Sequence, residues 1–349
     1  LAGSVNIDMI AAAAPNSLNQ LRVQSEGYDL CVIDLADLAA RKEEENTTMS
    51  LLRGECEAFR QRGAALSGLD VYVASNVPKG SGVSSSAAFE VLIGVILNDC
   101  FMTKKVSPIE IAQIGQYAEN IYFGKPCGLM DQTACAVGKV ITIDFKEVGH
   151  PVVREVPFDL AAKGFALCIS DTKGSHADLT DDYAAVRREM ESVAEFFGKK
   201  VLRDVDEETF LKAIPEVRKV TGDRAVVRAI HFYNDSRRAG EIYEAIKADD
   251  FDRFLQLIIE GGHSSFEFNQ NAYSIKNPQE QGVPLALAIS QKVLNGRGAW
   301  RLQGGGFAGT VLCVVPKNKC VRFLLDMSMN YGPDNVRKLS VRSCGACVL

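Results

Sequence analysis

Three glycine-containing segments combine residue types that can bind phosphate or move a proton. The first, Pro78 to Ala88, places glycines and three consecutive serines between a predicted strand and a predicted helix. Glycines let a backbone approach a ligand closely, and the unpaired amides of a helix N-terminus carry partial positive charge, so this segment favours a phosphate. The hydroxyl groups of Ser84, Ser85 and Ser86 could donate hydrogen bonds or bind Mg²⁺. The alternative is a glycine and serine turn followed by a serine cap.

The second segment, Lys125 to Gln132, follows a predicted helix and holds one aspartate in an apolar, glycine-containing turn. A carboxylate is costly to bury without a partner, which makes Asp131 a candidate general base or charge partner. The alternative is that Asp131 caps the helix that continues through the small residues Thr133 to Val137. The residues by themselves leave both interpretations open.

The third segment, Arg301 to Thr310, contains the spacing G-x-G-x-x-G at Gly304, Gly306 and Gly309. A dinucleotide-binding loop of this spacing opens a helix, whereas the residues that follow here, TVLCVV, predict a strand. The segment therefore predicts a tight glycine loop next to a binding cleft and not a dinucleotide site.

The elements that position these segments are predicted from hydrophobic spacing. In the first half of the chain we expect strands at 21–25, 30–34, 70–75, 140–145 and 151–156, and helices at 84–102 and 107–123. Ser107 and Pro108 are typical of the cap and first turn of the second helix. The charged run at 40–48 is predicted to be a solvated loop or the start of a helix.

The second half predicts strands at 165–170, 310–315 and 335–342, with helices at 181–197, 205–215, 222–247, 249–261, 281–294 and 317–329. Strands and helices mix without regular alternation, which favours an α+β fold over a doubly wound sheet. The length of 349 residues suggests two domains, and we place them at 1–160 and 161–349. Four arginines at three- or four-residue steps on one helix are expected to pair with acidic neighbours more readily than with phosphates: Arg224, Arg228, Arg237 and Arg238.

Composition excludes several classes of partner. A net charge of −5 lacks the basic excess that binding to nucleic acid or to a membrane surface requires. No apolar run is long enough to span a membrane. The ten cysteines lie mostly in apolar runs, which suits a reducing cytoplasm. Because the chain begins at Leu1 in strand-like sequence, we expect a further segment upstream of it.

Together and in this order, the three segments resemble the GHMP small-molecule kinases. A family motif built from a proline, a glycine and a run of serines matches Pro78 to Ala87, and a glycine loop of the family matches Gly304 to Gly309. The block P-C-G-x-M-D-Q, specific to the galactose-phosphorylating branch, matches Pro126 to Gln132 in full. The resemblance implies a two-domain GHMP-kinase-like fold. Its N-terminal domain would be α/β and its C-terminal domain ferredoxin-like, with the active site between them.

The resemblance also implies an activity, the ATP- and Mg²⁺-dependent phosphorylation of the C1 hydroxyl of a sugar, with D-galactose as the leading substrate. Asp131 would be the catalytic residue facing that hydroxyl, and Gly128 and Tyr183 would also contact the sugar. Ser86 and Glu119 match the Mg²⁺ positions. The residues expected to bind ATP are Gly80, Ser81, Gly82, Val83, Ser84, Ser85, Ser86, Gly304, Gly305 and Gly306.

Two alternatives remain at this point. The first motif of the family, with the arginine and the sugar-selecting residues, would lie upstream of Leu1. The same chain is therefore also compatible with a kinase for a uronic acid or an amino sugar, or with a silent protein that binds sugar and ATP and signals to a protein partner. We expect a cytoplasmic monomer whose ligands are a small sugar and ATP, with no nucleic-acid or membrane partner.

Overall fold

The computed structural model describes residues 1–78, 83–147, 149–174, 179–307 and 309–349, and the described chain divides into two compact units. Unit 1 comprises Leu1–Ile143, Val153–Glu155 and Val341–Leu349, and unit 2 comprises Asp144–Val152 and Val156–Ser340. The expected division at residue 160 differs from this one, because unit 2 already includes Asp144–Val152 and resumes at Val156, and because the last nine residues return to unit 1.

Backbone pairing explains why the end of the chain returns to unit 1. Val341 forms a bridge with Val5, and the amide of Arg342 donates to the carbonyl of Ser4 at 3.0 Å. The predicted strand at 335–342 is therefore too long, since the strand of unit 2 ends at Leu339 and the following residues pair elsewhere. Among the described residues, no helix is both long and apolar enough to cross a membrane.

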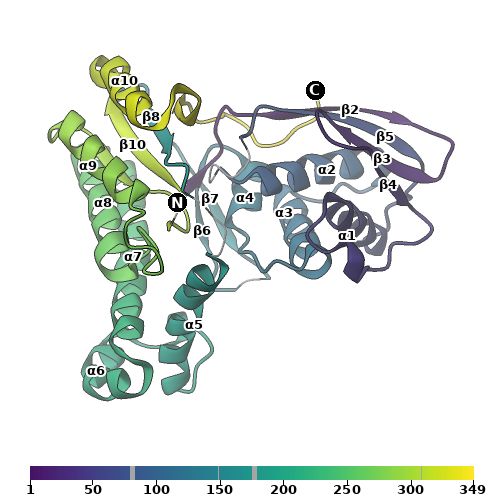
Figure 1. Ribbon diagram of the computed structural model, residues 1–349. Helices are drawn as coiled ribbons and strands as arrows, with labels where there is room; N and C mark the ends of the chain where they lie inside the picture. Colours follow the sequence, from purple (N-terminus) through teal and green to yellow (C-terminus); the bar gives the residue numbers. More distant parts are fainter. Residues whose placement is uncertain (79–82, 148, 175–178, 308) are drawn as a thin grey trace. The chain divides into compact units, whose positions relative to one another are not determined.

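Unit 1 is built on a mixed sheet with the strand order β2-β5-β3-β4 (Figure 1). Strands β3 and β5 pair in parallel and the other neighbours are antiparallel. Alternate residues such as Leu21, Val23, Val71 and Val73 are buried against α1 and α2, as a sheet with one covered face requires. The strands are β2 (Met9–Pro15), β3 (Gln20–Ser25), β4 (Cys31–Asp34) and β5 (Leu69–Ser75), so the strands predicted at 21–25, 30–34 and 70–75 are confirmed.

The helices of unit 1 carry two of the three chemical segments. They are α1 (Thr48–Gln61), α2 (Ser85–Phe101), α3 (Pro108–Tyr117) and α4 (Met130–Val137), and a π-helical segment at Ala118–Phe123 follows α3. A separate small sheet consists of β1 (Ala2–Gly3), β6 (Val140–Asp144) and β7 (Val152–Val156). Ser107 caps α3 as predicted: its hydroxyl accepts from the amide of Glu110, whose carboxylate accepts from the amide of Ser107 at 2.8 Å.

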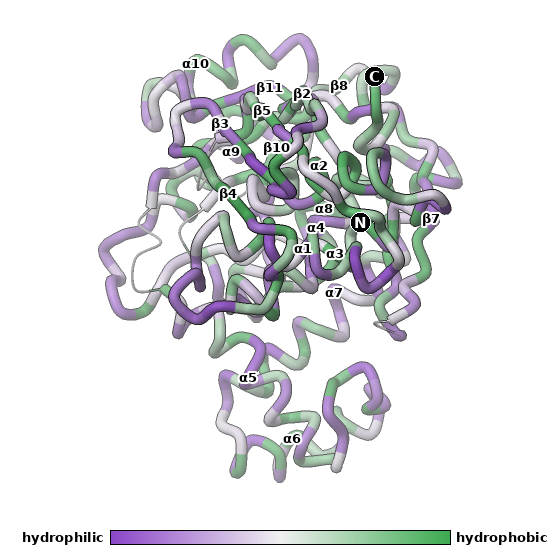
Figure 2. The backbone as a smooth tube through the Cα atoms, turned by 90° about the vertical axis from the view of Figure 1, so that its right-hand side faces the viewer, coloured by the Kyte–Doolittle hydropathy of each residue, from purple (hydrophilic) through white to green (hydrophobic). Residues whose placement is uncertain are grey.

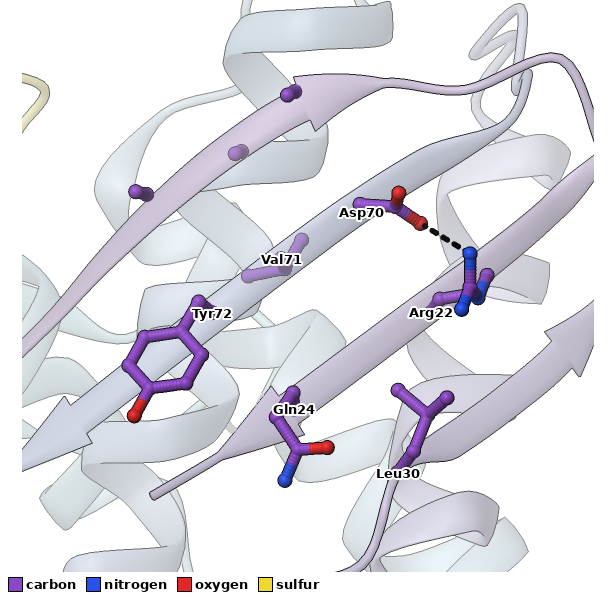
Figure 3. A pocket seen from close by; sticks show the side chains of 9 residues that line it. Arg22, Gln24, Leu30, Asp70, Val71 and Tyr72 are labelled. Carbon is purple, nitrogen blue, oxygen red and sulfur yellow. Dashed lines mark ion pairs between the residues drawn. The ribbon is translucent and has the colours of Figure 1, made fainter.

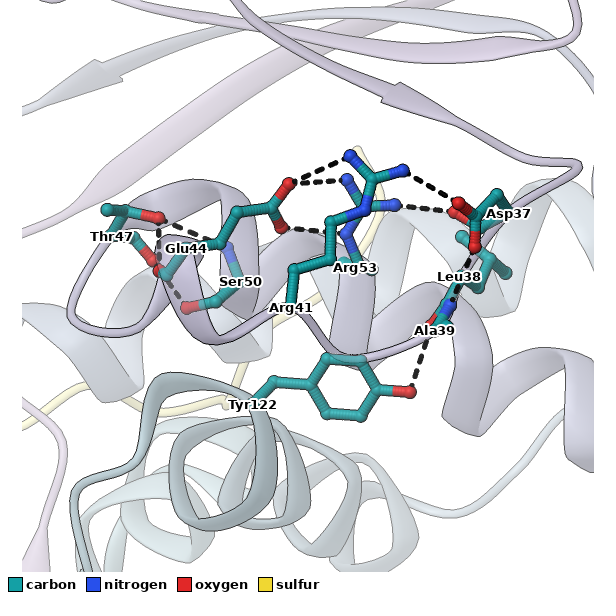
Figure 4. Close-up of polar contacts among 9 residues, drawn as sticks. All are labelled: Asp37, Leu38, Ala39, Arg41, Glu44, Thr47, Ser50, Arg53 and Tyr122. Atoms are coloured by element: carbon teal, nitrogen blue, oxygen red, sulfur yellow. Dashed lines mark hydrogen bonds and ion pairs between the residues drawn. The ribbon is translucent and has the colours of Figure 1, made fainter.

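The charged run before α1 is mostly exposed and ends where a helix begins, as predicted, but one of its residues is buried. Glu44 is buried, and its two carboxylate oxygens accept from Nε and Nη2 of the fully buried Arg53 on α1, both at 2.7 Å (Figure 4). The same guanidinium donates to the carbonyl of Asp37. This bidentate pairing satisfies a charge that could not otherwise leave water, and it holds the pKa of Glu44 below its usual range.

Unit 2 is built on an antiparallel sheet with the order β11-β8-β10-β9, which is the ferredoxin-like arrangement expected for the C-terminal domain. Along β10, Val311, Cys313 and Val315 pack toward α9 and α10, whereas Val314 packs toward α7 and α8, so helices cover both faces. The strands are β8 (Phe165–Asp171), β9 (Ala299–Leu302), β10 (Thr310–Pro316) and β11 (Val336–Leu339).

The helices of unit 2 agree with the predicted ones except at one proline. They are α5 (Thr180–Phe196), α6 (Glu207–Thr221), α7 (Asp223–Lys247), α8 (Phe251–Ser264), α9 (Gly282–Leu294) and α10 (Cys320–Tyr331). The prediction ended α6 at Pro215, but the helix continues past it because this position is exposed and water can satisfy the carbonyl that loses its amide partner. Figure 2 shows α6 alternating between polar and apolar residues, as a helix with one buried face does.

The arginine stripe on α7 pairs with acidic neighbours, as expected. Arg224 and Arg228 both bind Glu189, at 2.5 and 2.9 Å, and Arg237 binds Glu207 at 2.9 Å. These contacts hold α5, α6 and α7 together.

Candidate active site

The serine-rich segment leads into α2 and contacts the aspartate segment. Gly80, Ser81 and Gly82 lie outside the described residues, Val83 and Ser84 precede the helix, and Ser85 and Ser86 begin it. Ser84 has a φ of 59° and a ψ of 56°, a left-handed conformation that a serine rarely adopts. Its hydroxyl donates to Oδ2 of Asp131. The structure therefore brings together a residue expected at the phosphates and the residue expected at the sugar.

Asp131 lies in the first turn of α4 and is exposed. The capping position is Leu129, which makes no side-chain capping bond, so the alternative in which Asp131 caps the helix is wrong. A carboxylate in a first helical turn is favoured by the positive end of the helix dipole. With one oxygen held by Ser84, the carboxylate is oriented and still open to solvent, which is the condition for accepting a proton or a hydrogen bond from a ligand.

The next residue, Gln132, points into the interior of unit 1. Its Nε2 donates to Oε2 of Glu90 at 3.0 Å and to Oε2 of Glu119 at 3.1 Å, and all three side chains are buried. Glu119 was predicted from the sequence as a site residue, whereas Glu90 and Gln132 were not. Glu90 could have been found, because it is a carboxylate in an apolar helix four residues after Ser86, and therefore on the same helical face.

Burial changes the proton affinity of these carboxyl groups. Loss of solvent, followed by the charge of Glu119, raises the pKa of Glu90 to about 8. Glu55 on α1 is fully buried, and loss of solvent together with the charge of Glu90 raises its pKa well above the usual range. Within the described part of the chain, neither carboxyl oxygen of Glu55 has a hydrogen-bond partner.

We expect Glu55→Gln to reduce the loss of stability at high pH. A folded-state pKa above the unfolded value means that the folded chain keeps a proton that the unfolded chain has released. The contribution of Glu55 to the free energy of unfolding is therefore fully present below the pKa of the unfolded chain, and it is lost as pH rises through the pKa of the folded chain. The amide has nearly the shape of the protonated acid and does not titrate, so the melting temperature should fall less between about pH 5.5 and about pH 8.5 in the variant than in the wild type. Glu43→Gln, at an exposed position, is the control. If the melting temperature changed equally with pH in Glu55→Gln and in Glu43→Gln, the account would be contradicted.

Glu119 is a buried carboxylate whose two oxygens have different partners. One oxygen is held by Gln132, and the other, Oε1, lies 3.5 Å from Nζ of Lys125, a lysine that is 63% exposed while Glu119 is only 5% exposed. A carboxylate oxygen and the hydroxyl of Ser86 are ligands of the type that Mg²⁺ prefers. Among the described residues no cluster of three or more His, Cys, Asp or Glu is placed to hold a metal. Ser86 and Glu119 therefore remain a prediction for Mg²⁺, as one or two protein ligands that water and phosphate oxygens would complete.

In unit 2 the structure brings Tyr183 to the glycine loop. The Tyr183 hydroxyl donates to the carbonyl of Gly306 at 2.9 Å, and the ring meets Phe307 edge-on with 5.2 Å between centroids. A Cβ on Gly306, whose φ is 78°, would lie 2.0 Å from the carbonyl oxygen of Asn271, so only glycine fits there. Asn271, which sequence analysis missed, also donates to the carbonyl of Gly305 at 3.0 Å. These contacts fix the path of the loop.

Gly128 and a hollow on the sheet of unit 1 lie outside the hydrogen-bonded contacts described above. Gly128 lies on the exposed loop before α4, with open space where a Cβ would be. The outer face of the sheet of unit 1 has a shallow hollow between the alanines of β2 and the ion pair of Arg22 with Asp70, 3.6 Å apart (Figure 3). None of the residues expected to bind ATP, sugar or metal lines this hollow.

Comparisons with known proteins agree on one family. A model of the GHMP kinases N terminal domain matches residues 46–139. Galactokinase from Actinobacillus pleuropneumoniae is 33% identical over 302 residues, which cover 85% of this chain and 72% of that protein. Galactokinase from Streptomyces coelicolor is 31% identical over 313 residues, which cover 88% and 76%.

Solved structures agree at the level of the fold. The structure of Lactococcus lactis galactokinase complexed with galactose matches with a TM-score of 0.82 at 19% identity, covering 99% of this chain and 88% of that one. A mevalonate kinase structure matches with a TM-score of 0.62 at 12% identity, covering 97% and 90%. The chain therefore has the fold of these kinases.

Proposed function

This chain belongs to the galactokinase family, and from that premise we propose that it transfers the γ-phosphoryl group of ATP to the C1 hydroxyl of D-galactose. The observation that carries the proposal is the contact between Ser84 and Asp131. It places the carboxylate of the P-C-G-x-M-D-Q block at the segment that would hold the phosphates. A sugar hydroxyl facing that carboxylate would thus lie close to the group to be transferred.

In this proposal catalysis consists mainly of positioning and of stabilising negative charge. Asp131 orients the C1 hydroxyl and accepts its proton, and the amides and hydroxyls at the start of α2 bind phosphate oxygens. Ser86 and Glu119 would hold Mg²⁺, which neutralises charge on the phosphates when it is bound. Tyr183 and Gly128 would contact the sugar, and the loop of Gly304 to Gly306 would contact the nucleotide.

A panel of sugars tests the substrate. ADP release should be measured with ATP and, in turn, D-galactose, D-glucose, D-galacturonic acid and D-galactosamine. The proposal expects galactose to give kcat/KM at least about tenfold above the others, since hydrogen bonds to specific hydroxyls discriminate strongly. A preference for the uronic acid or the amino sugar would mean that this sugar, and not galactose, is the substrate of the same phosphoryl transfer. Binding of galactose and ATP without turnover would indicate the sensor instead.

The Mg²⁺ assignment has its own test. Glu119→Gln should raise the Mg²⁺ concentration that gives half-maximal rate by about tenfold or more, because a neutral amide is a poorer ligand for a hard cation. Rates are measured at fixed ATP with Mg²⁺ varied, and Glu43→Gln at an exposed position serves as the matched control. An unchanged Mg²⁺ dependence would remove Glu119 from the metal site.

The proposal also covers the state of the protein in the cell. We expect a cytoplasmic monomer whose ligands are a sugar and ATP. Light scattering during size-exclusion chromatography tests the oligomeric state, and a mass of twice the chain at micromolar concentration would contradict it.

A further inference from the structure

We propose that Gln132 is a positioning residue that fixes Glu119 for Mg²⁺ by bridging it to Glu90. The inference rests on the proposed function and deepens it, because it names what holds the metal ligand in place. Gln132 itself would touch neither the metal nor a substrate.

The bridge uses only the amide nitrogen of Gln132. This nitrogen, Nε2, donates to two carboxyl groups, to Oε2 of Glu90 at 3.0 Å and to Oε2 of Glu119 at 3.1 Å. The sulfur of Cys127, at 3.6 Å from Nε2, is a weaker acceptor. The amide oxygen of Gln132 has no hydrogen-bond partner within the described chain. The side chain of Gln132 therefore holds the two carboxyl groups through its amide nitrogen alone.

The bridge is enclosed and joins the elements that carry the site. Gln132 is on α4 next to Asp131, Glu90 is on α2 one turn after Ser86, and Glu119 is in the π-helical segment after α3. Gly115 of α3 closes over it, since a Cβ there would lie 3.0 Å from Oε2 of Glu90. Water has little access, so the amide is the group that can hold these two carboxyl groups side by side.

The bridge uses one oxygen of Glu119, and the other, Oε1, forms an ion pair with Lys125 at 3.5 Å. Because Lys125 is 63% exposed, its ammonium can move into solvent and leave Oε1 to a metal ion. A rotation of the Glu119 carboxylate would turn Oε1 away from that side. Removing the amide would allow this rotation, because it takes away the hydrogen bond that holds Oε2. The expected consequence is a weaker metal site in a protein that still folds.

Direct metal binding tests the inference. Mn²⁺ serves as a spectroscopic substitute for Mg²⁺, and its binding to the protein with saturating ADP is followed by electron paramagnetic resonance. Gln132→Met keeps the length of the side chain and removes the donor, and it should raise the Kd for Mn²⁺ by about tenfold. Adding Glu90→Gln to this variant supplies an amide from the opposite side, and it should recover at least half of the loss on a logarithmic scale.

The controls separate positioning from general damage. Gln116→Met removes another glutamine donor, which binds the carbonyl of Cys127 at 3.2 Å, without touching either carboxyl group, and its Kd should stay within about twofold of wild type. If Gln132→Met does not fold, Gln132→Asn, which withdraws the amide by one methylene, should weaken Mn²⁺ binding in the same direction.

Two results would overturn the inference. One is a Kd for the Gln132 variant within about twofold of wild type, and the other is a further loss on adding Glu90→Gln in place of the recovery. If wild type phosphorylates galactose and either result is found, only the inference fails. If wild type does not phosphorylate galactose, the proposed function fails and the inference fails with it.

Discussion

Asp131→Asn should lower kcat by about 10²–10⁴ and leave the KM for ATP within about threefold of wild type. Asparagine has nearly the shape of aspartate and can still accept a hydrogen bond from Ser84, so the contact between the two segments is kept. What is lost is the negative charge that orients and deprotonates the sugar hydroxyl. Steady-state kinetics with galactose and ATP varied in turn separates the effect on kcat from the effect on binding.

Asp29→Asn, at an exposed position between β3 and β4, is the matched control and should retain full activity. A variant of Asp131 that keeps more than about a third of wild-type kcat would remove this carboxylate from the chemistry. Its exposed place in the first turn of α4 would then reflect only the interaction with the helix dipole.

Arg53→Met should lower the free energy of unfolding by about 3–5 kcal/mol, because it leaves the carboxylate of Glu44 buried without its partner. Arg53 is 1% exposed and Glu44 is 7% exposed, so water cannot replace the lost hydrogen bonds without opening the structure. Thermal or denaturant unfolding followed by circular dichroism measures the change.

Two further variants show whether the cause is the unpaired charge. Adding Glu44→Leu to Arg53→Met should recover part of the loss, since it removes the stranded carboxylate. Arg41→Met, in the same cluster but 37% exposed, should cost about 1 kcal/mol or less (Figure 4). A double variant less stable than Arg53→Met, or equal losses at the two arginines, would contradict the explanation.

Periodicity predicted most of the elements, and it failed where a strand is short or does not alternate and where polar residues are buried. Strands β3, β4 and β5 follow from alternation, and the cap of α3 follows from Ser107 and Pro108, which are local signals. Strand β2, a run of alanines, and the short strand β9 were not predicted. Only the start of α1 was among the predictions, and its length was not predicted, because Arg53 and Glu55 interrupt the apolar spacing of its buried face. Both residues lie in the interior. Arg53 is paired there with Glu44, and burial raises the pKa of Glu55, but the apolar spacing of α1 indicates neither.

In the candidate site too, some residues could be predicted from local motifs and others could not. Asp131, Ser84 and Glu119 were predicted from motifs, and in the structure Ser84 contacts Asp131, which lies 47 positions further along the chain. Gln132 was read as the last letter of a motif, since nothing local tells that its amide reaches two carboxyl groups on other elements. Asn271 was missed for a similar reason, because its contact with Gly305 joins residues 34 positions apart.

The most direct test of the proposed activity is the identity of the product. The protein is incubated with ATP, Mg²⁺ and D-galactose, and the phosphorylated sugar is examined by ³¹P nuclear magnetic resonance with coupling to the sugar protons. The account predicts one new phosphate monoester whose phosphorus couples to the proton on C1, formed in equal amount with ADP. A phosphate on another carbon, or ADP formed with inorganic phosphate and no sugar phosphate, would contradict it.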